Sequence, residues 1–282
     1  MKVRNPSQAG TFYPGTESSL NAEIERCFLH EFGPGKLPKT SSKPIRSIKA
    51  LIVPHAGYIY SGAVASHSYY ALASDGTPDC VVIVGPNHTG MGSGVSIMNE
   101  GKWVTPLGEL SINSEVAKKI CDASGIVDID EEAHLHEHSI EVQIPFLQYL
   151  YGKNTSFVPI CMMMQDLETS INLGEAISRS IHDKNALVIA SSDMTHYEEG
   201  KIAKEKDREV IDAILNLDEV ALFNIIESKM ISMCGYGPVM STIVYGKKIG
   251  AKKTELMSYK TSGDTTGDHS SVVGYASLIF SK

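Results

Sequence analysis

Short runs of apolar and β-branched residues alternate along the chain with longer stretches of helical pattern. Continuous apolar runs of four to seven residues are typical of strands that are buried on both faces of a parallel sheet. We therefore predict buried strands at residues 48–53, 80–84, 157–161 and 187–190.

Helical signals lie between these runs. Asn113 and Asp218 each precede a stretch of helix-forming residues and can cap a helix N-terminus. Leu173, Ile177 and Ile181 form a stripe with a spacing of four residues, which indicates an amphipathic helix. Further helices are predicted at residues 62–73 and 201–217.

Turn-rich segments complete the pattern. Residues 94–111 carry turn residues in their middle, which predicts a hairpin or a loop excursion. Residues 255–259 and 271–280 predict an antiparallel strand pair, whereas the Pro-rich, basic stretch 33–49 predicts a surface loop. We therefore expect one α/β domain over residues 1–282, with a central mixed, largely parallel sheet flanked by helices.

Composition excludes several classes of function. The chain has 282 residues, and its 25 Lys and Arg residues against 33 Asp and Glu residues give a formal net charge of -8. This negative balance predicts no binding to nucleic acid or to an anionic membrane surface. The N-terminal segment lacks a continuous apolar stretch, and no later run reaches the length of a membrane span, so neither export nor membrane insertion is expected.

Cysteine usage indicates a reducing compartment. The five cysteines are widely spaced and include no CxxC pair, which predicts a cytoplasmic protein without a disulfide framework. Four of them have the apolar neighbours of buried thiols, whereas Cys234 lies in the Gly-rich turn 233–238, which suits a thiolate that reaches an ion or an electrophile. Met162, Met163 and Met164 are adjacent and cannot converge on one ion, so we interpret them as core residues.

Histidines follow three of the predicted strands. His55, His88 and His196 lie in turns that also contain Gly or Ser residues. Ligands gather at the carboxyl ends of parallel strands, and imidazole is the commonest metal ligand in proteins. One such histidine alone can be a hydrogen-bonded turn residue, but three of them predict a metal or catalytic site.

A second group of ligand-type residues occupies positions 130–141. If a helix begins near His138, then His138 and Glu141 share one face of it. Pro145 must start or kink the helix that follows. The alternative is an acidic helix-entry turn in which His134 and His136 are solvated.

Short ordered motifs along nearly the whole chain resemble the MEMO family, the homologues of mediator of ErbB2-driven cell motility. The resemblance implies an α/β fold similar to the class III extradiol (LigB-type) non-haem iron dioxygenases, with a site at the carboxyl edge of the sheet. The motifs are residues 4–6 with 10–14, 54–58, 85–88, 137–141, 191–193 with His196, 234–235, and 267–268 with 272–275.

The same resemblance implies a role for individual residues. His55 and His88 are the implied imidazole ligands of a metal ion, and Cys234 takes the place of the dioxygenase glutamate. His196 is the implied acid/base residue. The two other residues that are expected to line the same cleft are Asp193 and His138.

The thiol changes the expected chemistry. Two imidazoles with a carboxylate activate dioxygen on iron(II), whereas a thiolate is a soft ligand that also suits copper or zinc. The leading hypothesis is a cytoplasmic metal-binding protein of redox or dioxygenase-like type, with iron(II) or copper as cofactor. Two alternatives stay open: a non-catalytic module that binds a phosphorylated or carboxylate ligand in the same cleft, and a zinc-dependent hydrolase. The small-molecule or peptide partner and the oligomeric state also stay open.

Overall fold

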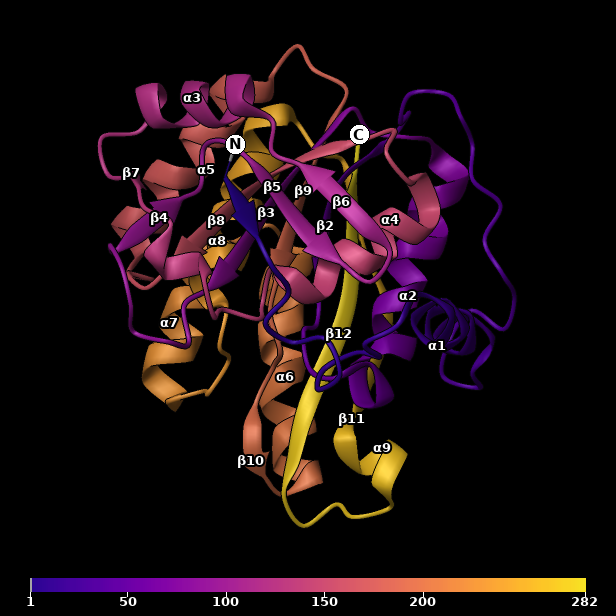
Figure 1. Cartoon of the computed structure of the whole chain (residues 1–282). Helices are drawn as coiled ribbons and strands as arrows, with labels where there is room; N and C mark the ends of the chain where they lie inside the picture. Colours follow the sequence, from indigo (N-terminus) through magenta and orange to yellow (C-terminus); the bar gives the residue numbers. More distant parts are fainter. Residues whose placement is uncertain (1) are drawn as a thin grey trace.

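A computed structural model describes residues 2–282 of the protein (Figure 1). The strands are β1 (Val3–Arg4), β2 (Ile48–Val53), β3 (Cys80–Pro86), β4 (Val95–Ile97), β5 (Lys102–Thr105), β6 (Gly108–Ser111), β7 (Asp128–Ile129), β8 (Ser156–Met162), β9 (Ala186–Ser191), β10 (His196–Glu198), β11 (Lys253–Thr261) and β12 (Val272–Ser281). The helices are α1 (Glu17–Leu29), α2 (Tyr58–Asp75), α3 (Ser114–Ala123), α4 (Ile144–Tyr151), α5 (Leu167–Ile181), α6 (Gly200–Leu215), α7 (Glu219–Lys229), α8 (Tyr236–Ile249) and α9 (Ser262–Thr266).

One large mixed sheet forms the centre of the molecule. Its strands follow the order β10-β12-β2-β9-β3-β8-β4-β7, and β11 pairs with β12 outside this path. The central strands β2, β9, β3 and β8 are parallel, whereas β12 and β4 join them antiparallel. A smaller sheet contains β1, β5 and β6. The predicted fold class, an α/β fold with a mixed sheet flanked by helices, is confirmed.

Helices cover both faces of the large sheet (Figure 1). Alternate residues of the central strands pack against α3, α5, α6, α7 and α8 on one face, and the intervening residues pack against α1, α2 and α4 on the other. Because successive side chains of a strand point to opposite faces, a strand buried on both sides needs an unbroken apolar run. This requirement explains why the central strands were recognisable from the sequence.

Most predicted elements are confirmed. The first predicted strand has the bounds of β2, and the other three are extended by one or two residues at one or both ends. The side chains of Asn113 and Asp218 cap α3 and α7, each accepting a hydrogen bond from a backbone N–H of the first turn. The segment 94–111 contains the hairpin of β5 and β6, and β11 and β12 form the expected antiparallel pair.

The helix expected near His138 begins close to that residue, because the His138 carbonyl accepts a hydrogen bond from the backbone N–H of Val142 (3.1 Å). The regular helical turn is Glu141–Gln143, and the shared face is wrong, because Glu141 binds Arg4 whereas His138 lines the cavity. The Glu137 carboxylate accepts hydrogen bonds from the backbone N–H groups of His138 (2.9 Å) and Ser139 (2.8 Å) and so fixes the backbone that leads into this turn. Pro145 stands in the first turn of α4, as predicted.

Two interpretations of single residues are also wrong. His134 is fully buried beside Trp103 rather than solvated, whereas His136 is exposed. Met162 is a core residue, but Met163 and Met164 are 40% and 54% exposed because β8 ends at Met162. A core role therefore holds for only one of these three methionines.

The carboxyl ends of β2, β3 and β9 lead into the loops that carry His55, His88 and Asp193. No helix among residues 2–282 combines the length and the apolar character that crossing a bilayer requires.

Candidate metal centre

A cavity of about 610 Å³ lies at the carboxyl edge of the sheet. Its lining includes all six residues that the sequence singled out, although some lie 179 positions apart. These residues are His55, His88, His138, Asp193, His196 and Cys234. The parallel strands therefore bring distant parts of the chain to one site.

Hydrogen bonds determine which nitrogen of His55 faces the cavity. Its Nδ1 lies 2.9 Å from the Ser191 hydroxyl. That hydroxyl donates its proton to the Ser139 carbonyl (2.6 Å) and accepts from the Gln143 side chain (2.8 Å), so it can only accept from Nδ1–H. Nε2 of His55 then carries a free lone pair, and it faces Cys234 Sγ at 3.2 Å.

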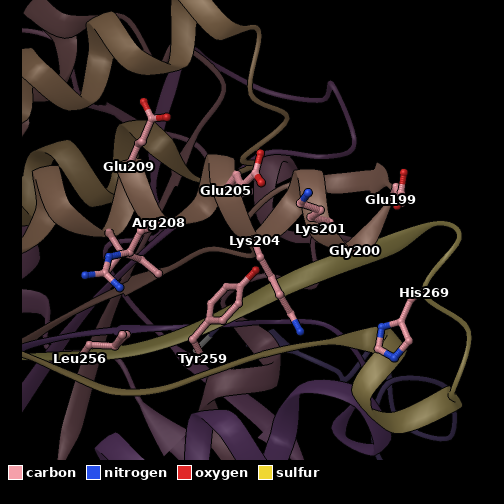
Figure 2. A pocket seen from close by; sticks show the side chains of 11 residues that line it. Glu199, Gly200, Lys201, Lys204, Glu205, Arg208, Glu209, Leu256, Tyr259 and His269 are labelled. Atoms are coloured by element: carbon pink, nitrogen blue, oxygen red, sulfur yellow. The ribbon is translucent and has the colours of Figure 1, made fainter.

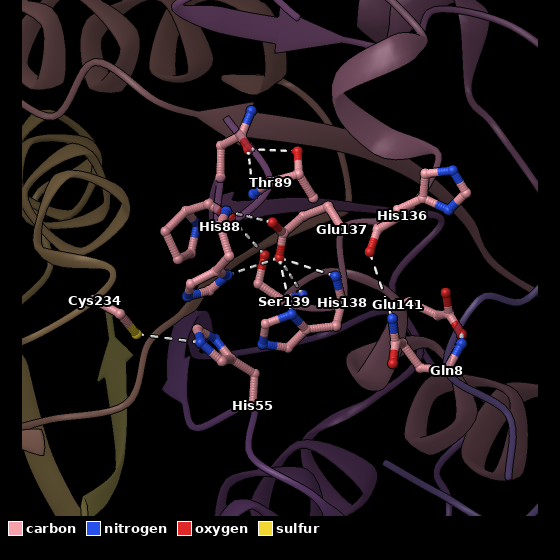
Figure 3. Close-up of polar contacts among 12 residues, drawn as sticks. Gln8, His55, His88, Thr89, His136, Glu137, His138, Ser139, Glu141 and Cys234 are labelled. Carbon is pink, nitrogen blue, oxygen red and sulfur yellow. Dashed lines mark hydrogen bonds and ion pairs between the residues drawn. The ribbon is translucent and has the colours of Figure 1, made fainter. Parts of the chain in front are cut away.

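Glu137 orients His88 in a similar way (Figure 3). Its Oε1 accepts from Nδ1 of His88 (2.9 Å), and its Oε2 accepts from the backbone N–H of the same residue. Burial opposes ionisation of Glu137, but these hydrogen bonds and the neighbouring imidazoles outweigh it and lower the pKa of this carboxyl far below its usual range. His88 therefore presents Nε2 to the cavity, and Glu137 fixes its orientation.

Cys234 reaches the site through a close approach of two loops. Its Sγ accepts a hydrogen bond from the backbone N–H of Asp193 (3.3 Å). A Cβ atom at the next residue, Gly235, would lie 2.5 Å from the Ser191 carbonyl oxygen, so only glycine permits this approach. Burial and the Asp193 carboxylate raise the pKa of the Cys234 thiol, so in the absence of a cation it is protonated and can donate to His55 Nε2.

These three residues form a group that can hold a metal ion. One ligand atom from each of His55, His88 and Cys234 lies within 4.8 Å of the others. Two imidazole nitrogens and one sulfur are a suitable donor set for copper, zinc or iron. His88, Glu137 and His138 form a second such group, but the Glu137 oxygens already accept four N–H groups, which favours an orienting role for this carboxylate.

Comparison with known proteins places the chain in a family. A family model described as Memo-like protein matches residues 4–279. The chain belongs to the Memo-like family. A MEMO1 family protein of Methanopyrus kandleri is 51% identical over 279 residues, which is 98% of each chain. A MEMO1 family protein of Sulfurisphaera tokodaii is 52% identical over 282 residues, which is 99% of each chain.

A solved structure shows a likeness of fold alone. The crystal structure of an uncharacterized protein from Escherichia coli K12 matches this Memo-like chain with a TM-score of 0.50 and 12% sequence identity. The match covers 82% of this chain and 99% of that chain. The resemblance to the MEMO family that the motifs indicated is thereby confirmed at the level of family and fold.

The remaining predicted residues of this Memo-like chain surround the ligand group. Nδ1 of His196 lies 2.8 Å and 2.9 Å from two backbone carbonyls, so this nitrogen is a donor and Nε2 is left to the cavity. Burial raises the pKa of Asp193 to about 6. Burial lowers the pKa of His138 to about 4, and its ring stacks on His88 with a centroid distance of 4.4 Å.

Several residues of the site were missed by the sequence reasoning. Glu137 stands inside a quoted motif, but nothing in its spacing distinguished it from the other acidic residues of 130–141. Phe12 and Tyr275 line the cavity from the two ends of the chain. Both lie in the motifs of the family resemblance, and that is the signal that could have identified them.

A larger cavity of about 1120 Å³ lies elsewhere in this Memo-like fold (Figure 2). It is formed by α6, β11 and the segment before β12, and it contains Tyr259 and His269. Its charged side chains carry both signs, and they include Lys204, Glu205 and Arg208. The candidate metal centre is the smaller cavity, because the histidine and cysteine ligands converge there.

Proposed function

We propose that this chain is a cytoplasmic metal-binding protein of redox type that holds iron(II) or copper through His55, His88 and Cys234. The observation that carries the proposal is the convergence of two correctly oriented imidazoles and a thiol within 4.8 Å. Ser191 and Glu137 each accept a hydrogen bond from Nδ1, so both rings present Nε2 with the free lone pair that a metal ligand requires. Membership of the Memo-like family supports the assignment.

The ligand set favours redox chemistry over simple structural binding. A bound iron or copper ion would supply one-electron chemistry, and the cavity beside the three ligands leaves space for a further ligand. A closed structural site would instead use four protein ligands. Zinc bound to the same three ligands would instead indicate a hydrolase. Metal analysis distinguishes the two possibilities, because it identifies the bound ion.

Two neighbouring side chains can move protons in this cavity. Asp193, whose pKa burial raises to about 6, exchanges a proton close to neutral pH. His196 keeps Nδ1 as a donor to backbone carbonyls and can accept a proton on Nε2. Val273 and Phe12 contribute apolar surface to the same cavity.

Metal analysis of protein purified without a histidine tag tests the proposal. We expect about one iron or copper ion per wild-type chain and a more than roughly tenfold lower content in His55→Ala and Cys234→Ser. His182→Ala is the matched control, because this histidine is exposed and lies outside the cavity. Equal metal content in all four proteins would contradict the proposal.

Metal loading is also expected to release a proton. Burial lowers the pKa of His55 well below its usual value, so this imidazole is already neutral, whereas the Cys234 thiol must lose its proton to bind an ion. Near pH 7 we expect release of about one proton per ion in the wild type and much less in Cys234→Ser. Calorimetry in two buffers of different ionisation enthalpy measures this number; proton release that the Cys234→Ser change leaves intact would exclude Cys234 as a ligand.

A further inference from the structure

Tyr275 is a buried tyrosine in the wall of the candidate metal centre. It is 2% exposed and lines the same cavity as His55, His88 and Cys234. Among residues 2–282, no group accepts a hydrogen bond from its hydroxyl. The ionisable side chains that influence its pKa are those of Asp193, Tyr60 and Tyr197. The hydroxyl oxygen itself is not closed off from the cavity, so a molecule that binds there can accept its hydrogen bond.

Several other buried tyrosines donate to protein acceptors, although Tyr245, which is 3% exposed, has no such acceptor among residues 2–282. The hydroxyl of Tyr13 donates to Glu141, that of Tyr69 donates to Gln143, and that of Tyr151 donates to the carbonyl of Gly76. The hydroxyl of Tyr275 differs from these three, because it faces the cavity and is available to a molecule that binds there.

The backbone holds Tyr275 in a fixed position beside His196. Val273 pairs with His196 across β12 and β10, and Tyr275 lies two residues further on the same face of β12. Between them, the backbone of Gly274 exchanges hydrogen bonds with Met194 (2.8 Å) and Thr195 (2.9 Å). The strand pairing therefore positions the phenol rather than leaving it to a mobile loop.

The phenol is a donor under ordinary conditions. Burial, and then the Asp193 carboxylate, raise the pKa of Tyr275 above its usual value, so the hydroxyl keeps its proton. A protonated phenol donates a hydrogen bond, so in this cavity it suits an oxygen anion better than a cation. Phe12 and Val273 provide apolar walls in the same cavity.

We propose that the Tyr275 hydroxyl donates a hydrogen bond to the anionic oxygen of a small organic ligand whose apolar body lies against Phe12 and Val273. The inference rests on the proposed function, because the metal ion would bind the same anionic group. Tyr275 is thus a binding residue of the site and not a metal ligand. The ligand class is a small organic oxyanion with an apolar side, such as an aromatic carboxylate.

Cobalt(II) is a suitable spectroscopic probe for the test, because its visible bands report both loading and a change of ligands. The wild type, Tyr275→Phe and Tyr60→Phe are loaded with cobalt(II) and titrated with benzoate and with acetate. Tyr60→Phe is the matched control, since it removes the same hydroxyl from a residue that is 42% exposed and does not line the cavity.

We expect Tyr275→Phe to bind cobalt(II) within about twofold of the wild type but to bind benzoate roughly tenfold more weakly, the loss typical of a hydrogen bond to a charged group. Tyr60→Phe should match the wild type, and benzoate should bind more tightly than acetate. Unchanged benzoate affinity in Tyr275→Phe, no preference for benzoate, or no binding of either anion to the loaded wild type would overturn the inference. Failure of the wild type to bind cobalt(II) would instead contradict the proposed function itself.

Discussion

Replacing Arg4 with alanine is expected to lower the free energy of unfolding by roughly 3–5 kcal/mol, the usual cost of removing one partner of a buried ion pair. Arg4 and Glu141 are joined at 2.6 Å, and their side chains are 2% and 1% exposed. Without the guanidinium, a buried carboxylate loses its counter-charge. Urea unfolding of the two proteins at neutral pH measures the difference.

Glu141 ties the N-terminal segment to the body of the protein. Besides Arg4, it accepts hydrogen bonds from the backbone of Ser7 (3.0 Å) and Gln8 (2.9 Å) and from the hydroxyl of Tyr13 (2.6 Å). Between these anchors lies Phe12, which lines the cavity of the candidate metal centre. The Arg4→Ala change should therefore loosen one wall of the site as well as reduce stability.

The pH dependence follows from the same contacts. Burial opposes the ionisation of Glu141, but Arg4, Tyr13 and Ser7 outweigh it and hold the pKa of this carboxyl below its usual range. A carboxyl with a lowered folded pKa contributes stability above its unfolded pKa of about 4.3, and this contribution is lost as the pH falls below that value. The difference in the free energy of unfolding between the wild type and Arg4→Ala should therefore become smaller as the pH falls below about 4.3.

Lys2→Ala is the matched control for this experiment. It removes the same charge two residues earlier, but its ion pairs with Glu100 and Glu131 are exposed to solvent. Exposed pairs are screened by water and contribute little. If Arg4→Ala unfolds at the same urea concentration as Lys2→Ala, the buried pair does not stabilise the fold as argued.

The central strands and the meeting of the histidines were predictable because both depend on local pattern. An apolar run that is buried on two faces is recognisable without its neighbours, as in residues 48–53. Parallel strands place their carboxyl ends at one edge, and only β9 separates β2 from β3, so the loops that carry His55 and His88 lie at the same edge. The positions of these residues were therefore predictable, whereas their bond partners were not.

Partners from distant parts of the chain left no local signal. The spacing of Glu141 from His138 indicated a possible ligand. In the structure its carboxylate instead forms an ion pair with Arg4, which is 137 positions away. Burial of His134 depends on Trp103 from the β5–β6 hairpin, which no period in the sequence connects with it. Long-range packing decided both cases, and only the assembled fold shows it.

Replacing Glu137 with glutamine is expected to weaken metal binding by roughly 10–100-fold, the usual effect of losing a residue that orients a ligand. The two carboxylate oxygens accept N–H groups on both sides, including Nδ1 and the backbone N–H of His88. A glutamine side chain has nearly the same volume but offers an NH₂ group where one of these oxygens stood. The NH₂ group of the glutamine then faces an N–H group that previously donated to the carboxylate. Two donors repel each other, so we expect His88 to shift from its position.

Competition between the protein and a chromophoric chelator for the same ion measures this loss. Glu132→Gln is the matched control, because it makes the same chemical change at an exposed position five residues earlier. His55 is held separately by Ser191, so the variant should keep part of its affinity, unlike His55→Ala or Cys234→Ser. Wild-type affinity in Glu137→Gln would mean that the loop backbone alone orients His88. A complete loss would mean that Glu137 itself binds the ion, as the second ligand group allows.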